Sequence, residues 1–328
     1  TDTGTRELFI MTNLIPAFCR CRAALKLAAC SSLPEQRNVQ LTEEEFQEHI
    51  IAEKVVDDRG RFREIYCEVL ERHGQELPDY RPCDEALRDT GEEEGATGEP
   101  VSLGNTEADY LMLLIPGLGW NCFEAWLDIS GSGPKHVAQF GYDVRMVNVD
   151  GLSSSANNAR MINEYVAGLP EEDVGKPIIL LGYSKGAPDI LEALVNYPEL
   201  AERVVAMISY AGAVKGSPLA VNADQAQANM LTMVPGSACE EEHGDNDAVA
   251  SLLPELRLQW LEDNPLPQNV RYYSVVAFPE PERVSWALKN SYLLLGETDA
   301  RNDTQLITLD QILPGSKMVA AANADHWA

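Results

Sequence analysis

The stretch that decides the fold is residues 177–197, which read PIILLGYSKGAPDILEALVNY. The apolar run PIILL is typical of a buried strand, and APDILEALVNY has the composition of a helix. Between them, residues 182–186 have the form Gly-x-Ser-x-Gly. A sharp strand-to-helix turn of this form strains the serine backbone and lifts its hydroxyl above the sheet, at the amino end of the helix. This context predicts that Ser184 is a nucleophile; the alternative is a serine in a structural turn.

The sequence around this stretch alternates short apolar runs with segments of helix length. Besides 177–182, five runs have the composition of buried strands: 110–115, 144–149, 203–209, 270–278 and 317–322. Continuous apolar strands separated by helices predict an α/β fold, with a mostly parallel sheet and helices on both faces.

Residues 213–268 are too long for one crossover between neighbouring strands, so we expect an inserted lid or cap there. Two stretches, 225–234 and 248–261, have helix-like apolar spacing. Between them, 240–247 read EEEHGDND, which is too charged to pack and predicts a solvated hinge. Two such helices would cover the pocket above Ser184, either as a moving lid or as a static cap.

The first ninety residues have helical patterns and no obvious chemistry. Residues 8–29 are rich in Leu, Ala, Ile and Phe, and 61–72 is typical of another helix. Between these, Thr42 and Glu45 have the spacing of a capping box at a helix start. The acidic, turn-forming run GEEEGATGEP begins at residue 91. We therefore expect three parts: a helical N-terminal region at 1–90, an acidic linker at 91–107 and the α/β domain at 108–328.

The chain is strongly acidic. Its 328 residues include 52 Asp and Glu against 25 Lys and Arg, which gives a net charge of −27. Such a surface repels phosphate backbones and anionic lipid headgroups, so we expect no nucleic-acid partner. The sequence contains no run of about 18 or more uncharged apolar residues, so we expect no transmembrane segment.

The seven cysteines are odd in number and too few for a disulfide scaffold in a chain of this size. We expect mostly reduced thiols and a cytoplasmic protein; secretion after removal of a signal segment is the alternative. Cys19, Cys21 and Cys30 could begin a metal site, but they lack a second closely spaced pair, so we expect no metal.

Ser184 needs a general base. The chain has five histidines: His49, His73, His136, His243 and His326. Only His326 follows a strand-like segment near the carboxyl end, in agreement with the chain order serine, acid, histidine. The acid should lie between residue 278 and this histidine, where the choices are Asp299, Asp303 and Asp310. Asp325 adjoins His326 and is badly placed to reach its ring.

The first predicted strand of the domain is followed by Pro116-Gly117-Leu118-Gly119-Trp120. These glycines let the backbone approach a substrate oxygen, so the amide of Leu118 can join that of Lys185 in an oxyanion hole. The alternative is an ordinary Pro-Gly turn. Three aromatic residues are candidates for substrate contact, although such residues are as often core: Trp120, Phe123 and Tyr183.

These segments together resemble the α/β-hydrolase superfamily, and within it bacterial lipases and related acyl hydrolases. PGLG at 116–119 is similar to their oxyanion loop, and GYSKG at 182–186 to their nucleophile elbow. Residues 211–220 are similar to their Gly-Pro-His-x-Gly-Ser-x-x-Ala stretch. Asn302-Asp303 and Asp325-His326 are similar to their acid loop and histidine, and this match favours Asp303 over Asp299.

The resemblance implies a carboxylic ester hydrolase that works by two-step acyl transfer through Ser184, His326 and Asp303, without metal or organic cofactor. The expected substrate is a small-molecule ester with an apolar acyl part. An acyltransferase or thioesterase with the same triad is an alternative, as is a non-catalytic scaffold. Three residues depart from the lipase pattern: Pro116 in place of histidine, Lys185 in place of glutamine or a small residue, and Thr304 in place of glycine.

Overall fold

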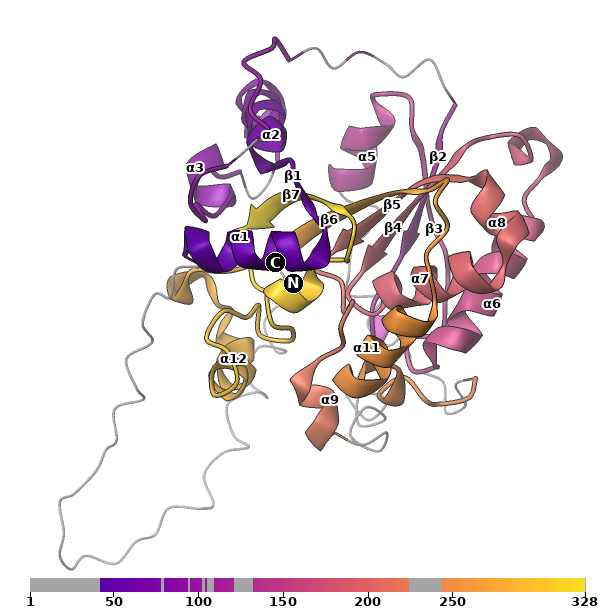
Figure 1. The fold of residues 1–328 in the computed structure, drawn as a ribbon. Coiled ribbons are helices and arrows are strands. Elements are labelled where there is room, and N and C mark those ends of the chain that lie inside the picture. The colour runs from indigo at the N-terminus through magenta and orange to yellow at the C-terminus, as the bar shows by residue number, and fades with distance from the viewer. Residues whose placement is uncertain are drawn as a thin grey trace, which may run out of the picture. The chain divides into compact units, whose positions relative to one another are not determined.

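Seven parallel strands form one sheet: β1 (Val56–Asp57), β2 (Leu111–Ile115), β3 (Asp143–Met146), β4 (Ile178–Tyr183), β5 (Val204–Tyr210), β6 (Arg271–Ala277) and β7 (Lys317–Ala322). Their order across the sheet is β1-β7-β6-β5-β4-β2-β3 (Figure 1). The order places β4, which leads into the Gly-x-Ser-x-Gly turn, in the interior of the sheet between β5 and β2.

The computed structural model describes residues 42–77, 80–93, 95–101, 104, 109–120, 132–223 and 244–327. Several sequence-based expectations fall outside these ranges: the helices at 8–29 and 225–234, the cysteine group Cys19, Cys21 and Cys30, the aromatic residue Phe123, and His243.

The helices cover both faces of the sheet (Figure 1). They are α1 (Glu43–Glu53), α2 (Arg59–His73), α3 (Cys83–Ala86), α5 (Ser132–Ala138), α6 (Ser155–Ala167), α7 (Gly186–Asn196), α8 (Pro198–Arg203), α9 (Pro218–Asn222), α11 (Pro254–Asp263) and α12 (Lys289–Gly296). α6, α7 and α8 pack against one face, whereas α2 and α5 lie over the other. This arrangement confirms the predicted α/β fold.

The main core lies between the central strands and α7. Leu113 and Leu180 point from β2 and β4 into this core, and both are fully buried with Ile190 of α7. The predicted strands are confirmed with small shifts at their ends. β3 stops at Met146, short of the predicted residue 149, because a tight turn in which Val149 donates to the carbonyl of Val147 ends the strand.

The strand order changes direction at β2. After β2 the chain runs outward to the edge strand β3 and then returns to β4 on the other side of β2. Parallel sheets form their ligand-binding crevice at the carboxyl ends of strands around such a switch point. Ile115 and Gly182 are register partners, so the loops that follow β2 and β4 begin side by side.

The N-terminal part adds a strand to the sheet. The capping box at the start of α1 is confirmed, because Thr42 accepts from the backbone of Glu45 and the Glu45 side chain accepts in return. β1 then pairs with β7, with Val56 opposite Lys317. The region is therefore not helical throughout as expected, since a two-residue strand is too short to leave a period in the sequence. Residues 38–328 form one compact unit.

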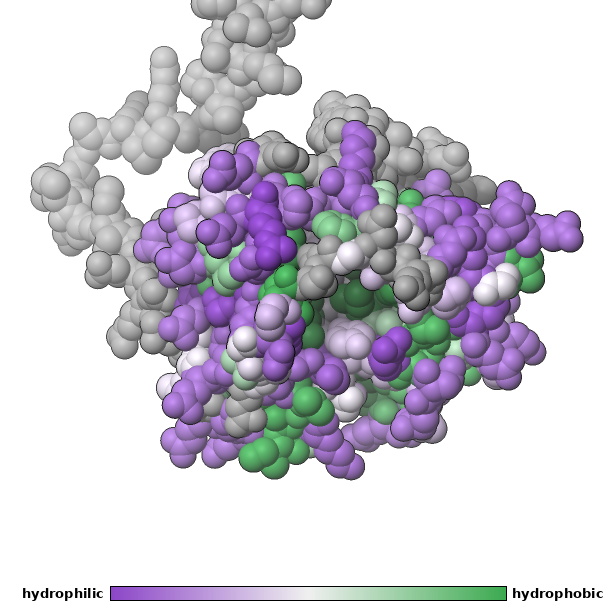
Figure 2. Space-filling model, turned by 90° about the horizontal axis from the view of Figure 1, so that it is seen from above, coloured by the Kyte–Doolittle hydropathy of each residue, from purple (hydrophilic) through white to green (hydrophobic). Residues whose placement is uncertain are grey.

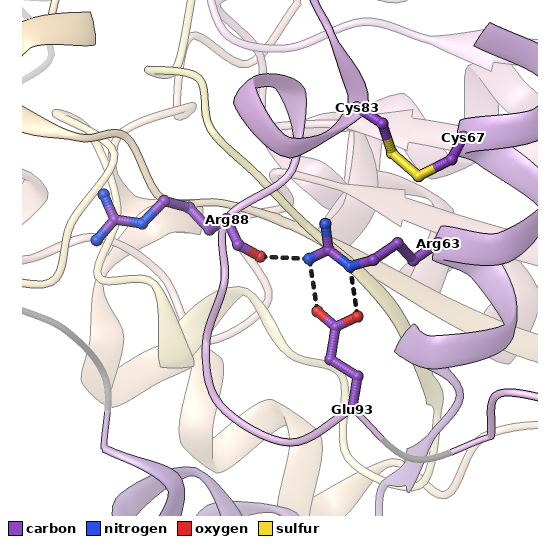
Figure 3. The surroundings of a disulfide bond; sticks show 5 residues. All are labelled: Arg63, Cys67, Cys83, Arg88 and Glu93. Atoms are coloured by element: carbon purple, nitrogen blue, oxygen red, sulfur yellow. Dashed lines mark hydrogen bonds and ion pairs between the residues drawn. A yellow bond between two sulfur atoms is a disulfide. The ribbon is translucent and has the colours of Figure 1, made fainter. Parts of the chain in front are cut away.

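An ion pair and hydrogen bonds hold the acidic segment after residue 91 against α2. Arg63 forms a two-point ion pair with Glu93, with N–O distances of 2.5 and 2.6 Å, and donates to the carbonyl of Arg88 (Figure 3). Glu64 accepts from the backbone amides of Thr97 and Gly98, and these bonds lower its pKa to about 2.

A disulfide joins Cys67 of α2 to Cys83 at the start of α3 (Figure 3). The expectation of reduced thiols is therefore wrong for this pair; the other five cysteines lie outside the described residues. The pairing follows from how α3 folds back on α2, which an odd cysteine count cannot reveal.

Viewed from the side of α2 and α5, the molecule is largely hydrophilic, and hydrophobic side chains gather around a central hollow (Figure 2). Among the described helices, none has both the length and the apolarity needed to cross a membrane.

The disulfide should stabilise the protein mainly by restricting the unfolded chain. Its cysteines are 16 residues apart, and closing a loop of that size is worth about 3 kcal/mol. The double variant Cys67→Ser/Cys83→Ser should lose about that much free energy of unfolding in urea titrations. Dithiothreitol should destabilise the wild type to the same extent and leave the variant unchanged; equal stability of all samples would contradict this account.

Candidate active site

Ser184 occupies the sharp turn between β4 and α7, where its φ is 54°. The left-handed region is strained for a residue with a side chain. Glycine on each side makes the turn possible. A Cβ on Gly186 would lie 2.2 Å from the carbonyl oxygen of Ile115, and one on Gly182 would lie 2.7 Å from the Cα of Ala187.

Hydrogen bonds hold the strained backbone in place. The amide of Ser184 donates to the carbonyl of Tyr210 at 3.2 Å, and its carbonyl accepts from the amides of Ala187 and Ala213. The turn is thus fixed from both α7 and the loop after β5.

His326, in the loop after β7, lies between Ser184 and Asp303. Its Nε2 is 2.8 Å from Ser184 Oγ, and its Nδ1 is 2.7 Å from Asp303 Oδ2. The His326 amide also donates to the carbonyl of Asp303. When Nδ1 carries its proton toward the carboxylate, Nε2 is left free to accept one from the serine hydroxyl.

The Asp303 carboxylate is fully buried and fixed by several donors. Oδ1 accepts from the amides of Gln305 and Leu306 at 2.9 and 2.7 Å, and Oδ2 accepts from Gln311 Nε2 at 3.2 Å. These donors from its own loop and from Gln311 hold the carboxylate in one orientation. Sequence reasoning missed Gln311, since a lone glutamine eight residues further along carries no motif.

The competing acids lie elsewhere. Burial alone would raise the pKa of Asp299, but hydrogen bonds from Arg301 lower it below its usual value. Asp325 accepts from the amides of Ser285 and Trp327 instead of the imidazole. Burial raises the pKa of Asp310, whose backbone carbonyl accepts from Lys215. Of the candidates, the structure brings only Asp303 to the ring of His326.

Tyr183 holds the histidine loop. Its hydroxyl donates to the carbonyl of His326, and the two rings lie 5.2 Å apart. Burial raises the pKa of Tyr183, so the hydroxyl stays protonated and remains a donor. Because the hydroxyl makes this hydrogen bond, the substrate contact expected from the sequence would be made by the ring of Tyr183.

The loop after β2 presses against the serine. A Cβ on Gly117 would lie 2.8 Å from that of Ser184, so only glycine allows this approach. The next residue, Leu118, is 38% exposed, and Lys185 lies just before α7. Within the described ranges, neither backbone N–H donates to another group of the chain.

Two cavities lie near the sheet. One of about 370 Å³ is at the amino ends of β6 and β7, opposite the edge that carries Ser184. The other, about 230 Å³, lies beside α2, and its lining includes Tyr66, Tyr210 and Ala324.

Trp120, one of the aromatic candidates for substrate contact, is mostly buried. Across the described ranges, no cluster of His, Cys, Asp and Glu side chains is arranged to hold a metal ion.

The inserted segment differs from expectation where it is described. The stretch 248–261 forms a 3₁₀ turn, Ala250–Leu252, and then α11, because Pro254 cannot continue a helix from the preceding residues. Asp245 is exposed, in agreement with the expected solvated stretch, but it is anchored to the chain. It accepts from the amide of Ser154 and the hydroxyl of Ser153 at 2.7 Å, and despite partial burial these bonds lower its pKa. A run of charged residues in the sequence does not reveal these hydrogen bonds, because Ser153 and Ser154 are distant in sequence from Asp245.

Comparison with solved structures identifies the family. A metagenomic carboxyl esterase is 39% identical over 84% of this chain and 82% of its own, with a TM-score of 0.76. A lipase of Bacillus licheniformis shares the fold: in its mature form it is 21% identical, with 70% of this chain and 89% of its own covered and a TM-score of 0.55. No family model and no curated protein matches the sequence.

The chain therefore belongs to the α/β-hydrolase superfamily and is a serine hydrolase with that fold. Within that superfamily it is a lipase- and esterase-like enzyme of the carboxylic ester hydrolase class.

Thr304, which follows Asp303 and replaces the glycine of the lipase pattern, is a strained residue. Its φ is 89°, a value that strongly disfavours a β-branched side chain, and the side chain is fully buried. Thr304→Gly should raise the free energy of unfolding by about 1 kcal/mol, since strain of about 1–3 kcal/mol exceeds the entropy cost of glycine.

The matched control is Thr308→Gly. Thr308 is also buried, but its φ is −58° and its hydroxyl donates to the carbonyl of Ala277. This variant should be destabilised. If thermal unfolding places both variants below the wild type, Thr304 is not strained in the way its backbone indicates.

Proposed function

We propose that this enzyme hydrolyses small-molecule carboxylic esters with an apolar acyl part, with Ser184 as nucleophile, His326 as general base and Asp303 as the orienting acid. The observation that carries the proposal is the pair of contacts made by the His326 ring: 2.8 Å to Ser184 Oγ and 2.7 Å to Asp303 Oδ2. This is the geometry that acyl transfer by a serine triad requires.

In the first step, Ser184 Oγ attacks the ester carbonyl carbon while His326 Nε2 takes the hydroxyl proton. The carbonyl oxygen becomes an oxyanion, which the amides of Leu118 and Lys185 stabilise. The amino end of α7 adds favourable electrostatics at the same point. The oxyanion then collapses and the ester C–O bond breaks, while His326 gives its proton to the departing oxygen. The alcohol leaves, and the acyl group remains on Ser184.

In the second step, His326 removes a proton from water, which attacks the acyl-enzyme. A second oxyanion forms in the same hole and collapses to release the carboxylic acid, and Ser184 regains its proton from His326. Asp303 acts in both steps. It holds the imidazole in one tautomer and stabilises the imidazolium that forms in each step.

The apolar acyl part is supported by the surroundings of the site. The cavity beside α2 is lined largely by aromatic and aliphatic side chains, among them Phe62, Tyr66 and Leu87. Its lining reaches Asn323 and Ala324, the first two residues of the loop that carries His326. An apolar chain gains affinity by leaving water for such a cavity.

Ser184→Ala should abolish nearly all hydrolysis of p-nitrophenyl esters without unfolding the protein. Loss of a triad nucleophile lowers kcat by about 10⁶-fold, while the small hydroxyl contributes little packing. Ser209→Ala is the matched control, because Ser209 is a buried serine opposite Gly182 on the next strand. Ser209→Ala should keep its activity; a folded Ser184→Ala variant with more than a few per cent of wild-type kcat contradicts the assignment.

Asp303→Asn should lower kcat by about 10⁴-fold, since the amide favours the wrong imidazole tautomer. Asp299→Asn tests the other candidate acid. The Asp299 carboxylate contacts Arg301, through an ion pair and a hydrogen bond from the Arg301 amide, so the change should alter kcat by less than about threefold. Steady-state kinetics at a pH where wild type is fully active decide between the two. A larger loss for Asp299→Asn would reverse the assignment of the acid.

A further inference from the structure

The proposed oxyanion hole takes its two N–H donors from separate elements. Leu118 lies in the loop after β2, whereas Lys185 lies at the start of α7. An oxyanion is stabilised only when both donors point at the position it will occupy. Something must therefore fix these two backbone segments relative to each other, and the sheet itself ends before either donor.

Asn158 on α6 lies between the two segments and is 1% exposed. Its Nδ2 donates to Asp189 Oδ2 at 2.7 Å and to the carbonyl of Asp150 at 2.9 Å. Its Oδ1 accepts from the amide of Asp150 at 3.2 Å. Both amide hydrogens and the amide oxygen are therefore engaged, and the side chain has one defined orientation.

On one side, Asn158 reaches the nucleophile elbow. Asp189 Oδ1 accepts from Lys185 Nζ at 2.8 Å, and both side chains are 1% exposed. Lys185 is thus drawn inward and locked by an ion pair one helical turn along α7. Its own backbone N–H is one of the two proposed donors. A buried pair of this kind holds its geometry because breaking it leaves an uncompensated charge.

On the other side, Asn158 reaches the loop after β3, which in turn contacts the loop after β2. Its side chain forms hydrogen bonds with both the amide and the carbonyl of Asp150. The Asp150 carboxylate in turn accepts from the amide of Leu152 at 2.9 Å. The intervening Gly151 accepts from the amide of Gly119 at 2.9 Å. Gly119 follows Leu118 directly, so the second donor is one residue from the end of this chain of hydrogen bonds.

We propose that Asn158 is a positioning residue that sets the separation of the two oxyanion donors by tying Asp189 and Lys185 to the Asp150–Gly119 contact. The inference rests on the proposed function, since it needs an oxyanion at Ser184. A displacement of about 1 Å in a reacting geometry costs about 10²-fold in rate, and removal of one donor costs about 10²–10³-fold. Loosening one segment should cost somewhat less.

Asn158→Leu keeps nearly the same volume and removes all three hydrogen bonds. Its kcat for p-nitrophenyl esters should fall about 10–100-fold, with KM changed less than about threefold. The inhibition constant of an alkyl trifluoromethyl ketone, whose adduct with serine carries an oxyanion, should rise by a similar factor. Rates are expressed per active site titrated with a phosphonate, so that loss of folded protein does not lower them.

Asn269→Leu is the matched control. Asn269 also donates its side-chain amide to a backbone carbonyl, that of Ala201 at 2.7 Å, but near the amino end of β6. This variant should keep its kcat and its inhibition constant even where its melting temperature falls. Asn158→Asp is nearly the same shape, turns donors into acceptors beside Asp189, and should show the same pattern as Asn158→Leu if the latter does not fold.

The proposal is overturned if a folded Asn158 variant has a lower melting temperature but wild-type kcat per site and wild-type ketone inhibition. It is also overturned if neither Asn158 variant folds, because the residue would then serve the fold itself. Failure of the proposed function has a different signature: wild-type enzyme whose activity survives Ser184→Ala, or whose phosphonate adduct is not on Ser184.

Discussion

The site depends on one close approach of backbone to backbone. Gly186, at the start of α7, passes the carbonyl of Ile115 at the end of β2 with no room for a side chain. This contact brings the helix close enough to force Ser184 into a left-handed conformation between β4 and α7. The serine hydroxyl then projects beyond the sheet, where only a residue from another loop can reach it.

That residue is His326, and its loop is held from three directions. Asp303 binds the ring and the backbone amide, and Tyr183 binds the backbone carbonyl. Asp303 is in turn fixed by amides of its own loop, which turns sharply through Thr304 at a positive φ. Strain is therefore stored on both sides of the histidine, at Ser184 and next to Asp303, as is common at functional sites.

Much of this arrangement could be predicted from sequence because its signals are local. Buried strands are predicted by apolar runs, and the strand-to-helix turn by Gly-x-Ser-x-Gly. The chain order serine, acid, histidine favours His326 as the base. Asp303 required the family resemblance, since Asp299 has equally suitable local sequence. β1, the Cys67–Cys83 disulfide and the anchoring of Asp245 depend on residues distant in sequence, and single-sequence patterns carry no record of such partners. The same holds for Asn158, whose hydrogen bonds link three elements.

The central claim is that Ser184 is activated by His326 within this turn. Its most direct test is reaction with a fluorophosphonate, followed by digestion and mass spectrometry of the modified peptide, for wild type and for His326→Ala. The account predicts one adduct per chain, on Ser184, and at least about a thousandfold slower labelling without the imidazole. Stoichiometric inactivation with the adduct on another residue, or labelling of Ser184 at an unchanged rate in His326→Ala, would contradict it.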